Sequence, residues 1–226
     1  MTSYMQTPKQ NRTSHRLLGL GRLFLFLLTC FILSGPVKAD RLDEAATLVQ
    51  SLLKDLSSPE LADNSLSAED KQSRLSDILD TYFDIDGITR FTVGRYWRTA
   101  SPAQREEYTK LFKTVLISEA STRFDQIMHF DFRLMEKQPR GDKLILISGV
   151  VHDNSNQIPD TKMVWRIASE QGKSQKIIDI EIENISMLKT QQDENTALIR
   201  RNGGDFSILI EAMRAKIKDI HNAKTG

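Results

Sequence analysis

Hydrophobic residues recur at two different spacings along the chain, and these spacings predict its secondary structure. Residues 40–56 carry apolar side chains at three- and four-residue steps, which is typical of an amphipathic helix. Ser67 opens a capping-box pattern before a second helix. Asp84 and Ser101 are the predicted N-caps of a short helix and of a long helix over residues 102–128. The first part of the chain is therefore predicted to be helical.

A two-residue alternation follows the long helix. Phe130, Phe132 and Leu134 alternate with polar residues, and further strands are predicted over residues 143–151, 163–167 and 178–182. Short, turn-rich connections favour an antiparallel meander. Helical spacing returns at residues 187–202 and in a last helix that begins at Asp205. The predicted fold class is α+β, with an antiparallel sheet of about four strands packed against N- and C-terminal helices.

The first 39 residues have the order of a secretory signal peptide. A basic stretch precedes an apolar run at residues 23–33, and small residues follow it up to Ala39. A membrane anchor would have a similar pattern, but a bilayer span needs roughly 18–20 apolar residues and this run is shorter. We expect cleavage after Ala39, which would leave a single domain over residues 40–226 that does not span a membrane.

Charge and cysteine content narrow the function of that domain. Without residues 1–39, Lys plus Arg falls from 31 to 26 while Asp plus Glu stays at 30, a net charge near −4. This balance argues against a nucleic-acid-binding protein. Cys30 is the one cysteine and lies inside the signal segment, so the domain would have neither a disulfide nor a thiolate metal site.

No motif in the chain indicates catalysis or metal binding. The histidines left after cleavage, His129, His152 and His221, lack metal-ligand spacing, and no nucleophile elbow is present. Residues 84–87 resemble part of a calcium loop but lack its distal glutamate, so a helix start is the simpler interpretation. Asp179, Glu181 and Glu183 alternate with isoleucines and are expected on a solvated face of the sheet. We therefore predict no enzymatic activity, no metal and no cofactor.

Two stretches of the chain resemble one protein family. The first contains FDIDGI, VGRYWR and ASPAQR within residues 83–105, and the second contains IIDIEIENIS, KTQ and NGG within residues 177–204. Both are similar to the MlaC-like, toluene-tolerance family of periplasmic lipid-binding proteins, and the likeness covers essentially all of residues 40–226. The chain departs from the family pattern at Asn184, where glycine is usual. Gln192 and Asn195 likewise replace an arginine and an aromatic residue.

The resemblance implies a periplasmic carrier that holds phospholipid acyl chains in an apolar pocket between sheet and helices. Such carriers shuttle lipid between the outer and inner membranes and so maintain lipid asymmetry. Their partners are an inner-membrane ABC transporter complex and an outer-membrane lipoprotein complex. A related branch handles hopanoids. A ligand-free periplasmic adaptor, an envelope hydrolase and a receptor for a small polar solute compete with the carrier as functions for this chain.

Candidate pocket residues are chosen by their position in the apolar pattern. Enclosing an acyl chain is worth about 0.8 kcal/mol per methylene, so a broad apolar lining is needed. The candidates are Tyr96, Trp97, Phe112, Val115 and Leu116 from the first helical part, Leu146, Val150, Met163, Trp165, Ile178 and Ile180 from the sheet, and Leu209 and Met213 from the last helix. Each also suits an ordinary packed core, which the spacing of residues does not distinguish from a hollow one.

Overall fold

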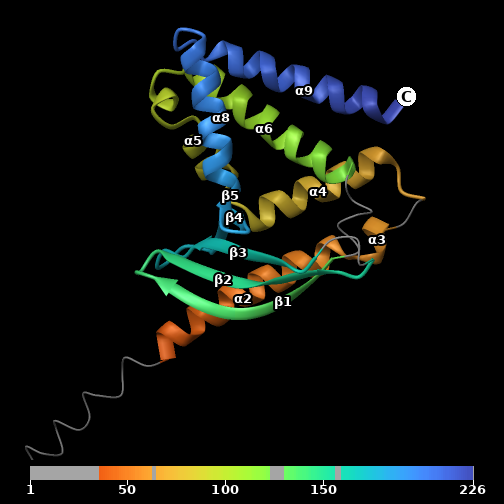
Figure 1. The fold of residues 1–226 in the computed structure, drawn as a ribbon, viewed down its shortest axis with the longest axis vertical. Helices are drawn as coiled ribbons and strands as arrows, with labels where there is room; N and C mark the ends of the chain where they lie inside the picture. Colours follow the sequence, from red (N-terminus) through yellow and green to blue (C-terminus); the bar gives the residue numbers. More distant parts are fainter. Residues whose placement is uncertain (1–35, 63–64, 123–129, 156–158, 226) are drawn as a thin grey trace, which may run out of the picture. The chain divides into compact units, whose positions relative to one another are not determined.

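The computed structural model of the protein describes residues 36–62, 65–122, 130–155 and 159–225 (Figure 1). The chain divides after Asp40 into two units, and the second, Arg41–Gly226, contains the fold described here. The predicted signal segment lies almost entirely outside the described residues, as does Cys30. Cleavage after Ala39 stays a prediction.

Helices form both ends of the described chain. They are α2 (Pro36–Leu56), α3 (Pro59–Ala62), α4 (Ala68–Tyr82), α5 (Ile85–Val93), the 3-10 helix η1 (Gly94–Arg98), α6 (Pro102–Thr122), α8 (Met187–Arg201) and α9 (Ser207–Thr225). The long helix predicted to reach residue 128 is α6. Its last predicted residues, 123–128, lie outside the described residues.

The middle of the chain forms an antiparallel meander, and the predicted α+β class is confirmed. The strands are β1 (Phe130–Arg140), β2 (Leu144–Asp153), β3 (Thr161–Ala168), β4 (Lys176–Ile182) and β5 (Ile185–Ser186), in the spatial order β1-β2-β3-β4-β5. Four strands match the prediction, and the two-residue β5 is an addition. Glu183 and Asn184 join β4 to β5 with φ of 49° and 64°. Positive φ at both positions is the geometry of a type I′ hairpin turn, which asparagine and glycine adopt most readily.

The predicted helix caps form as their local spacing requires. Ser67 Oγ accepts a hydrogen bond from the Asp70 amide at the start of α4. Asp84 Oδ1 accepts from the Gly87 amide at 2.9 Å and caps α5. A Cβ on residue 87 would lie 2.3 Å from Asp84 Oδ2, so the capping carboxylate would have to shift for any larger residue there. Asp84 is therefore occupied as a helix cap, in agreement with the simpler interpretation of this motif.

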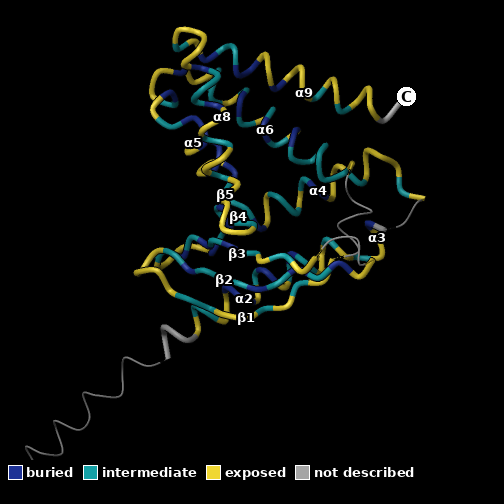
Figure 2. The backbone as a smooth tube through the Cα atoms, viewed as in Figure 1, coloured by how far each residue is buried: buried dark blue, intermediate teal, exposed yellow. Residues whose placement is uncertain are grey.

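One hydrophobic cluster joins α2 to the sheet. α2 lies along one sheet face, and its Ala45 and Val49 pack with Ile147 and Trp165 (Figures 1 and 2). The buried residues of β2 alternate with half-buried ones, so this strand presents one fully buried face to α2. The opposite face of β2 is half-buried, although residues 143–151 are apolar at both parities.

A second cluster fills the space among α5, α6, α8 and α9. Its largest fully buried side chain is that of Tyr108 on α6, which contacts Phe112 and Phe206 ring to ring. A third, smaller cluster forms around Leu61 and Leu75. Most apolar residues of the described helices thus serve one of three packed cores.

Candidate functional site

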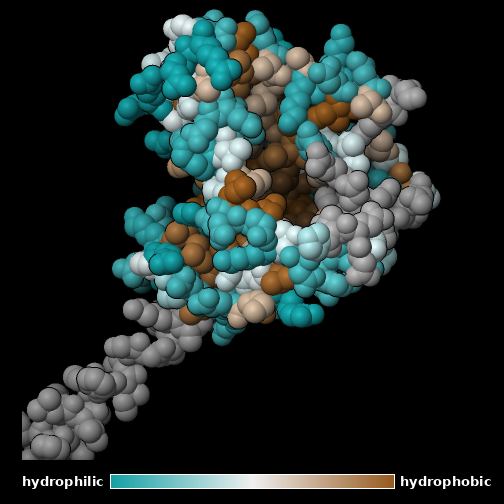
Figure 3. All heavy atoms as spheres, in the orientation of Figure 1, coloured by the Kyte–Doolittle hydropathy of each residue, from teal (hydrophilic) through white to brown (hydrophobic). Residues whose placement is uncertain are grey.

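An apolar cavity of about 320 Å³ lies where the three clusters meet. Figure 3 shows a deep recess of hydrophobic residues at the centre of the molecule. Fifteen lining residues are hydrophobic, namely Leu52, Leu56, Leu75, Ile78, Leu79, Phe83, Ile88, Phe112, Leu116, Ile117, Ala120, Ile178, Ile180, Met187 and Leu188. The other three are Thr92, Asp179 and Gln191. Such a lining suits an apolar ligand with few directed polar contacts.

The cavity exists because the chain passes from one cluster to the next at Phe83. This residue packs against both large clusters, and it forms an isolated parallel bridge with Ile177. The Asp84 amide donates to the Ile177 carbonyl at 3.0 Å, which ties the start of α5 to β4. The helices on one side and the sheet on the other are held by this junction, with unfilled space beside it.

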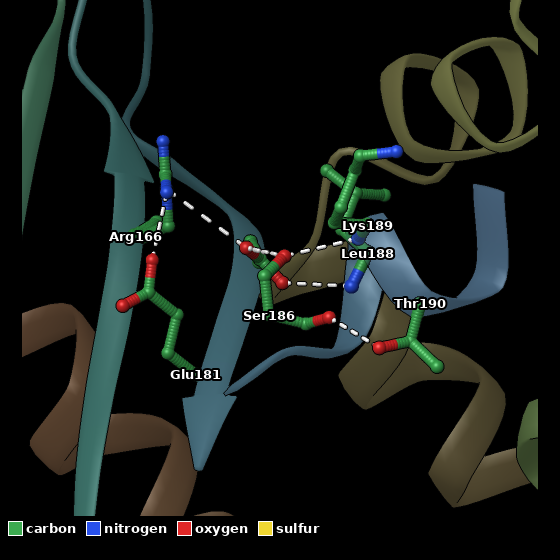
Figure 4. A network of polar contacts seen from close by, with 7 residues as sticks. Arg166, Glu181, Ser186, Leu188, Lys189 and Thr190 are labelled. Carbon is green, nitrogen blue, oxygen red and sulfur yellow. Dashed lines mark hydrogen bonds and ion pairs between the residues drawn. The ribbon is translucent and has the colours of Figure 1, made fainter. Parts of the chain in front are cut away.

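Asp179 on β4 places a carboxylate in the cavity wall. It is only 5% exposed, so the predicted solvated face is wrong at this position. Figure 4 shows this polar network, in which Arg166, Ser186 and Leu188 are labelled. Oδ2 accepts from the Ser186 hydroxyl at 2.6 Å, and Oδ1 accepts from the Leu188 amide at 2.9 Å. Arg166 Nε lies 3.9 Å from Oδ2, so the buried charge has both hydrogen bonds and a counterion. The carboxylate anchors the start of α8.

A chain of buried hydrogen bonds runs from the other polar residues of the wall into the helical cluster. Gln191 Nε2 donates to Asn195 Oδ1, and Asn195 Nδ2 donates to the Tyr108 hydroxyl, both at 2.9 Å. The Tyr108 hydroxyl lies 2.8 Å from Thr92 Oγ1, which in turn donates to the Thr89 carbonyl. Burial raises the pKa of Tyr108 well above its ordinary value, although these hydrogen bonds act in the opposite direction. Asn195, one of the departures from the family pattern, is thus at the centre of this network.

Four of the thirteen predicted pocket residues line the cavity. They are Phe112, Leu116, Ile178 and Ile180. Val115, Leu209 and Met213 belong to the helical cluster, while Met163 and Trp165 pack in the α2–sheet cluster. Leu146 and Val150 are half-buried and have the opposite parity to the buried Ile145 and Ile147 of β2. Tyr96 and Trp97 line two other recesses on the helical side.

Sequence reasoning missed the contribution of α4. Leu75, Ile78 and Leu79 form the apolar side of α4, and they line the cavity together with Leu52 and Leu56 of α2. The sequence signal for these lining residues was only that each helix has an apolar side. Which of these sides faces solid packing and which faces a void depends on how the helices are spaced in three dimensions.

The recess beside Trp97 gathers residues of the first family-like stretch. Arg105 lies over the Trp97 ring at 5.6 Å, near Asp84, Asp86 and Arg90. Ser101 and Gln104 form a reciprocal capping box, with the Gln104 amide donating to Ser101 Oγ and Gln104 Oε1 accepting from the Ser101 amide. This stretch thus shapes the α5–η1–α6 connection, and its caps are structural.

Metal sites, paired histidines or membrane-spanning helices among the described residues would indicate other functions. No cluster of three or more His, Cys, Asp or Glu side chains suited to a metal ion is found among them. His152 Nδ1 lies 2.7 Å from Asp160 Oδ1 on the surface, and His129 lies outside the described residues. None of the helices in the described ranges is long and apolar enough to span a bilayer.

Comparison with known proteins agrees with the resemblance noted in the sequence. A family model described as MlaC protein matches residues 46–215. Among solved structures, the chain is similar to a phospholipid-binding protein from Ralstonia solanacearum, determined in complex with a phospholipid. The TM-score is 0.65 at 17% sequence identity, and the match covers 79% of this chain and 97% of that chain. At this identity the structural match establishes a common fold.

Proposed function

The chain belongs to the MlaC family, and on that premise we propose that it binds phospholipid and holds the acyl chains in the central cavity. The observation that carries this proposal is the lining, in which fifteen of eighteen residues are hydrophobic. A structural relative in complex with a phospholipid supports the same ligand class. Transfer of each methylene from water into such a lining contributes about 0.8 kcal/mol.

The volume of the cavity sets a condition on binding. About 320 Å³ is near the lower end of the roughly 300–1,000 Å³ usual for ligand pockets. Because this volume is small for two long acyl chains, we expect binding to require separation of the lining helices. Leu56, Leu79 and Leu116 lie on three different helices and are only half-buried, so such a separation would break few tight contacts. The carrier would then close partly when its lipid leaves.

A transport role extends this proposal. The secretory pattern of residues 1–39 and the family membership support a periplasmic carrier that moves phospholipid between the outer and inner membranes. Its partners would be an inner-membrane ABC transporter complex and an outer-membrane lipoprotein complex. The transporter would drive the transfer, so this chain needs no enzymatic step.

Lipid content of the purified protein tests the binding proposal. Native mass spectrometry with lipid extraction should find phospholipid at defined stoichiometry. Leu116→Glu should lose most of it, because a carboxylate in the cavity wall would be desolvated by the tails. Met135→Glu is the matched control, since Met135 is 67% exposed on β1 and should retain lipid. The circular dichroism of both variants shows whether the fold persists.

The outcomes separate the competing functions. Protein that contains no lipid and takes up none from vesicles would contradict the carrier and favour a ligand-free adaptor. A hopanoid in the extract, in place of phospholipid, would move the chain to the hopanoid-handling branch. For localisation, fractionation and N-terminal sequencing of the exported protein should give Asp40 as the first residue. A cytoplasmic, uncleaved chain would contradict it.

A further inference from the structure

Three arginines converge on a recess at the far end of α8 from the cavity. The recess has a volume of about 530 Å³ and is lined by Arg95 and Arg98 of η1, Arg200 of α8 and neighbouring residues of both segments. All three arginines are exposed. Tyr96, predicted to contact lipid tails, instead forms part of this wall.

The arginines of the recess have no acidic partner among the described residues. The ion pairs of the described chain involve other side chains, although acids slightly outnumber bases after residue 39. Arg200 is in the last turn of α8, where a cation is stabilised by the helix dipole. Arg95 and Arg98 are in the last turn of η1, which has only five residues and therefore a much smaller dipole. Three like charges around one recess repel one another unless an anion binds there.

The recess is partly ordered before any ligand binds. Arg95 donates to the Tyr96 hydroxyl at 3.1 Å, and its guanidinium lies 5.0 Å from the centre of the Tyr96 ring. Gly203 and Gly204 have φ of 70° and 88° and line the same recess. A Cβ on Gly203 would meet no atom within 4 Å, so the turn leaves the recess open.

We infer that this recess binds the phosphate of an anionic lipid head group and docks the protein on a bilayer surface. Guanidinium groups offer planar pairs of donors that match phosphate oxygens, and clusters of basic residues favour anionic head groups. The recess is separate from the cavity, but one helix links them, with Gln191 at the cavity and Arg200 at the recess. Docking at Arg200 would keep the cavity within the length of α8 from the membrane from which lipid is taken or to which it is given.

Vesicle flotation tests the inference on the full exported protein. The vesicles contain phosphatidylglycerol in phosphatidylcholine, or phosphatidylcholine alone, at low and high salt. The variant is Arg98→Gln with Arg200→Gln. The matched control, Arg133→Gln with Arg140→Gln, removes the same charge from exposed positions on β1. The recess variant should bind phosphatidylglycerol vesicles roughly 20-fold more weakly, and the control should change less than about three-fold.

Several results would overturn the inference. Equal losses in both double variants would indicate unspecific charge attraction. Absence of vesicle binding, with inorganic phosphate alone perturbing the arginine NMR signals, would indicate a site for free phosphate. Absence of both would leave an acidic protein surface as the partner.

Co-purified lipid, measured on the same variants, keeps this test separate from that of the proposed function. The recess variant should retain its lipid, and a loss there would contradict two distinct sites. Lipid-free protein that still floats with phosphatidylglycerol vesicles would contradict the carrier proposal and leave the docking surface supported.

Discussion

The α2–sheet cluster and the helical cluster are packed by different means. Around Ile147 and Ile167 the α2–sheet cluster is mostly aliphatic, and the hydroxyl of its member Tyr82 bonds outward to the exposed Asp55. The helical cluster surrounds a hydrogen-bonded group made by Thr92, Tyr108 and Asn195. A mostly aliphatic core tolerates many arrangements of similar volume, whereas a network of buried polar groups favours the one arrangement that satisfies it.

The cavity lies at the junction of these two clusters. Leu52 belongs to the α2–sheet cluster, Phe112 to the helical cluster and Leu75 to the small third cluster, yet all three line the cavity. Two packed clusters joined at Phe83 leave space between them where neither provides enough side-chain volume. The proposed lipid-binding space therefore lies at the junction and in neither core.

Truncation of a side chain inside the α2–sheet cluster should have the largest effect on stability. Ile147→Ala removes a fully buried side chain, so the free energy of unfolding should fall by about 2–5 kcal/mol. Ile117→Ala, in the cavity wall, should reduce it by less than half as much, because part of that side chain already faces empty space. Urea denaturation of both variants measures the difference. Equal losses would mean that the cavity is closed in solution.

Removal of the buried hydroxyl from the helical cluster should have the next largest effect. Tyr108→Phe leaves Asn195 Nδ2 without its acceptor, which should reduce the free energy of unfolding by about 1–3 kcal/mol. The double variant with Asn195→Leu should recover part of this loss, since both polar partners are then gone. Urea denaturation of the single and double variants gives the coupling free energy between Tyr108 and Asn195. Additive losses would contradict a shared network.

A larger side chain in the cavity should raise the stability of the protein and lower its lipid content. Ala120→Leu adds volume to the cavity wall and should raise the free energy of unfolding by about 0.5–2 kcal/mol. The same variant should carry less lipid, since its tails compete for that volume. Thermal unfolding and lipid extraction provide the two readouts. A destabilised variant with normal lipid content would show that residue 120 faces packed side chains.

The smallest effect at neutral pH is expected at Tyr82, whose hydroxyl donates to Asp55 Oδ2 at 2.6 Å. Burial, followed by the hydrogen bond and the charge of Asp55, raises the pKa of Tyr82 from 10.0 to about 12. The unfolded chain therefore loses this proton first, so stability from Tyr82 is full below pH 10 and disappears between pH 10 and 12. Tyr82→Phe should lose about 1 kcal/mol at pH 7. Its unfolding free energy should then decline less steeply than that of the wild type above pH 10. Parallel declines would contradict this assignment.

Local features of the fold were predictable from the sequence. The caps at Ser67, Asp84 and Ser101, and the strand that begins at Phe130, follow from residues within a few positions of each other. Four cavity residues were also predicted, because Phe112, Leu116, Ile178 and Ile180 lie on the apolar sides of their elements. The remaining candidates were not distinguished from packed core, since a residue on an apolar side is equally suited to both.

The sequence by itself determined the α+β class, the order of the elements and the membership of a lipid-binding family, because periodicity, capping and motif spacing act over short distances. Only the tertiary structure decided that Asp179 is buried, that α4 lines the cavity and that three arginines share one recess. These features depend on the distance and angle between elements far apart in the chain. Such distances result from the packing of whole clusters, and no local pattern of residues encodes them.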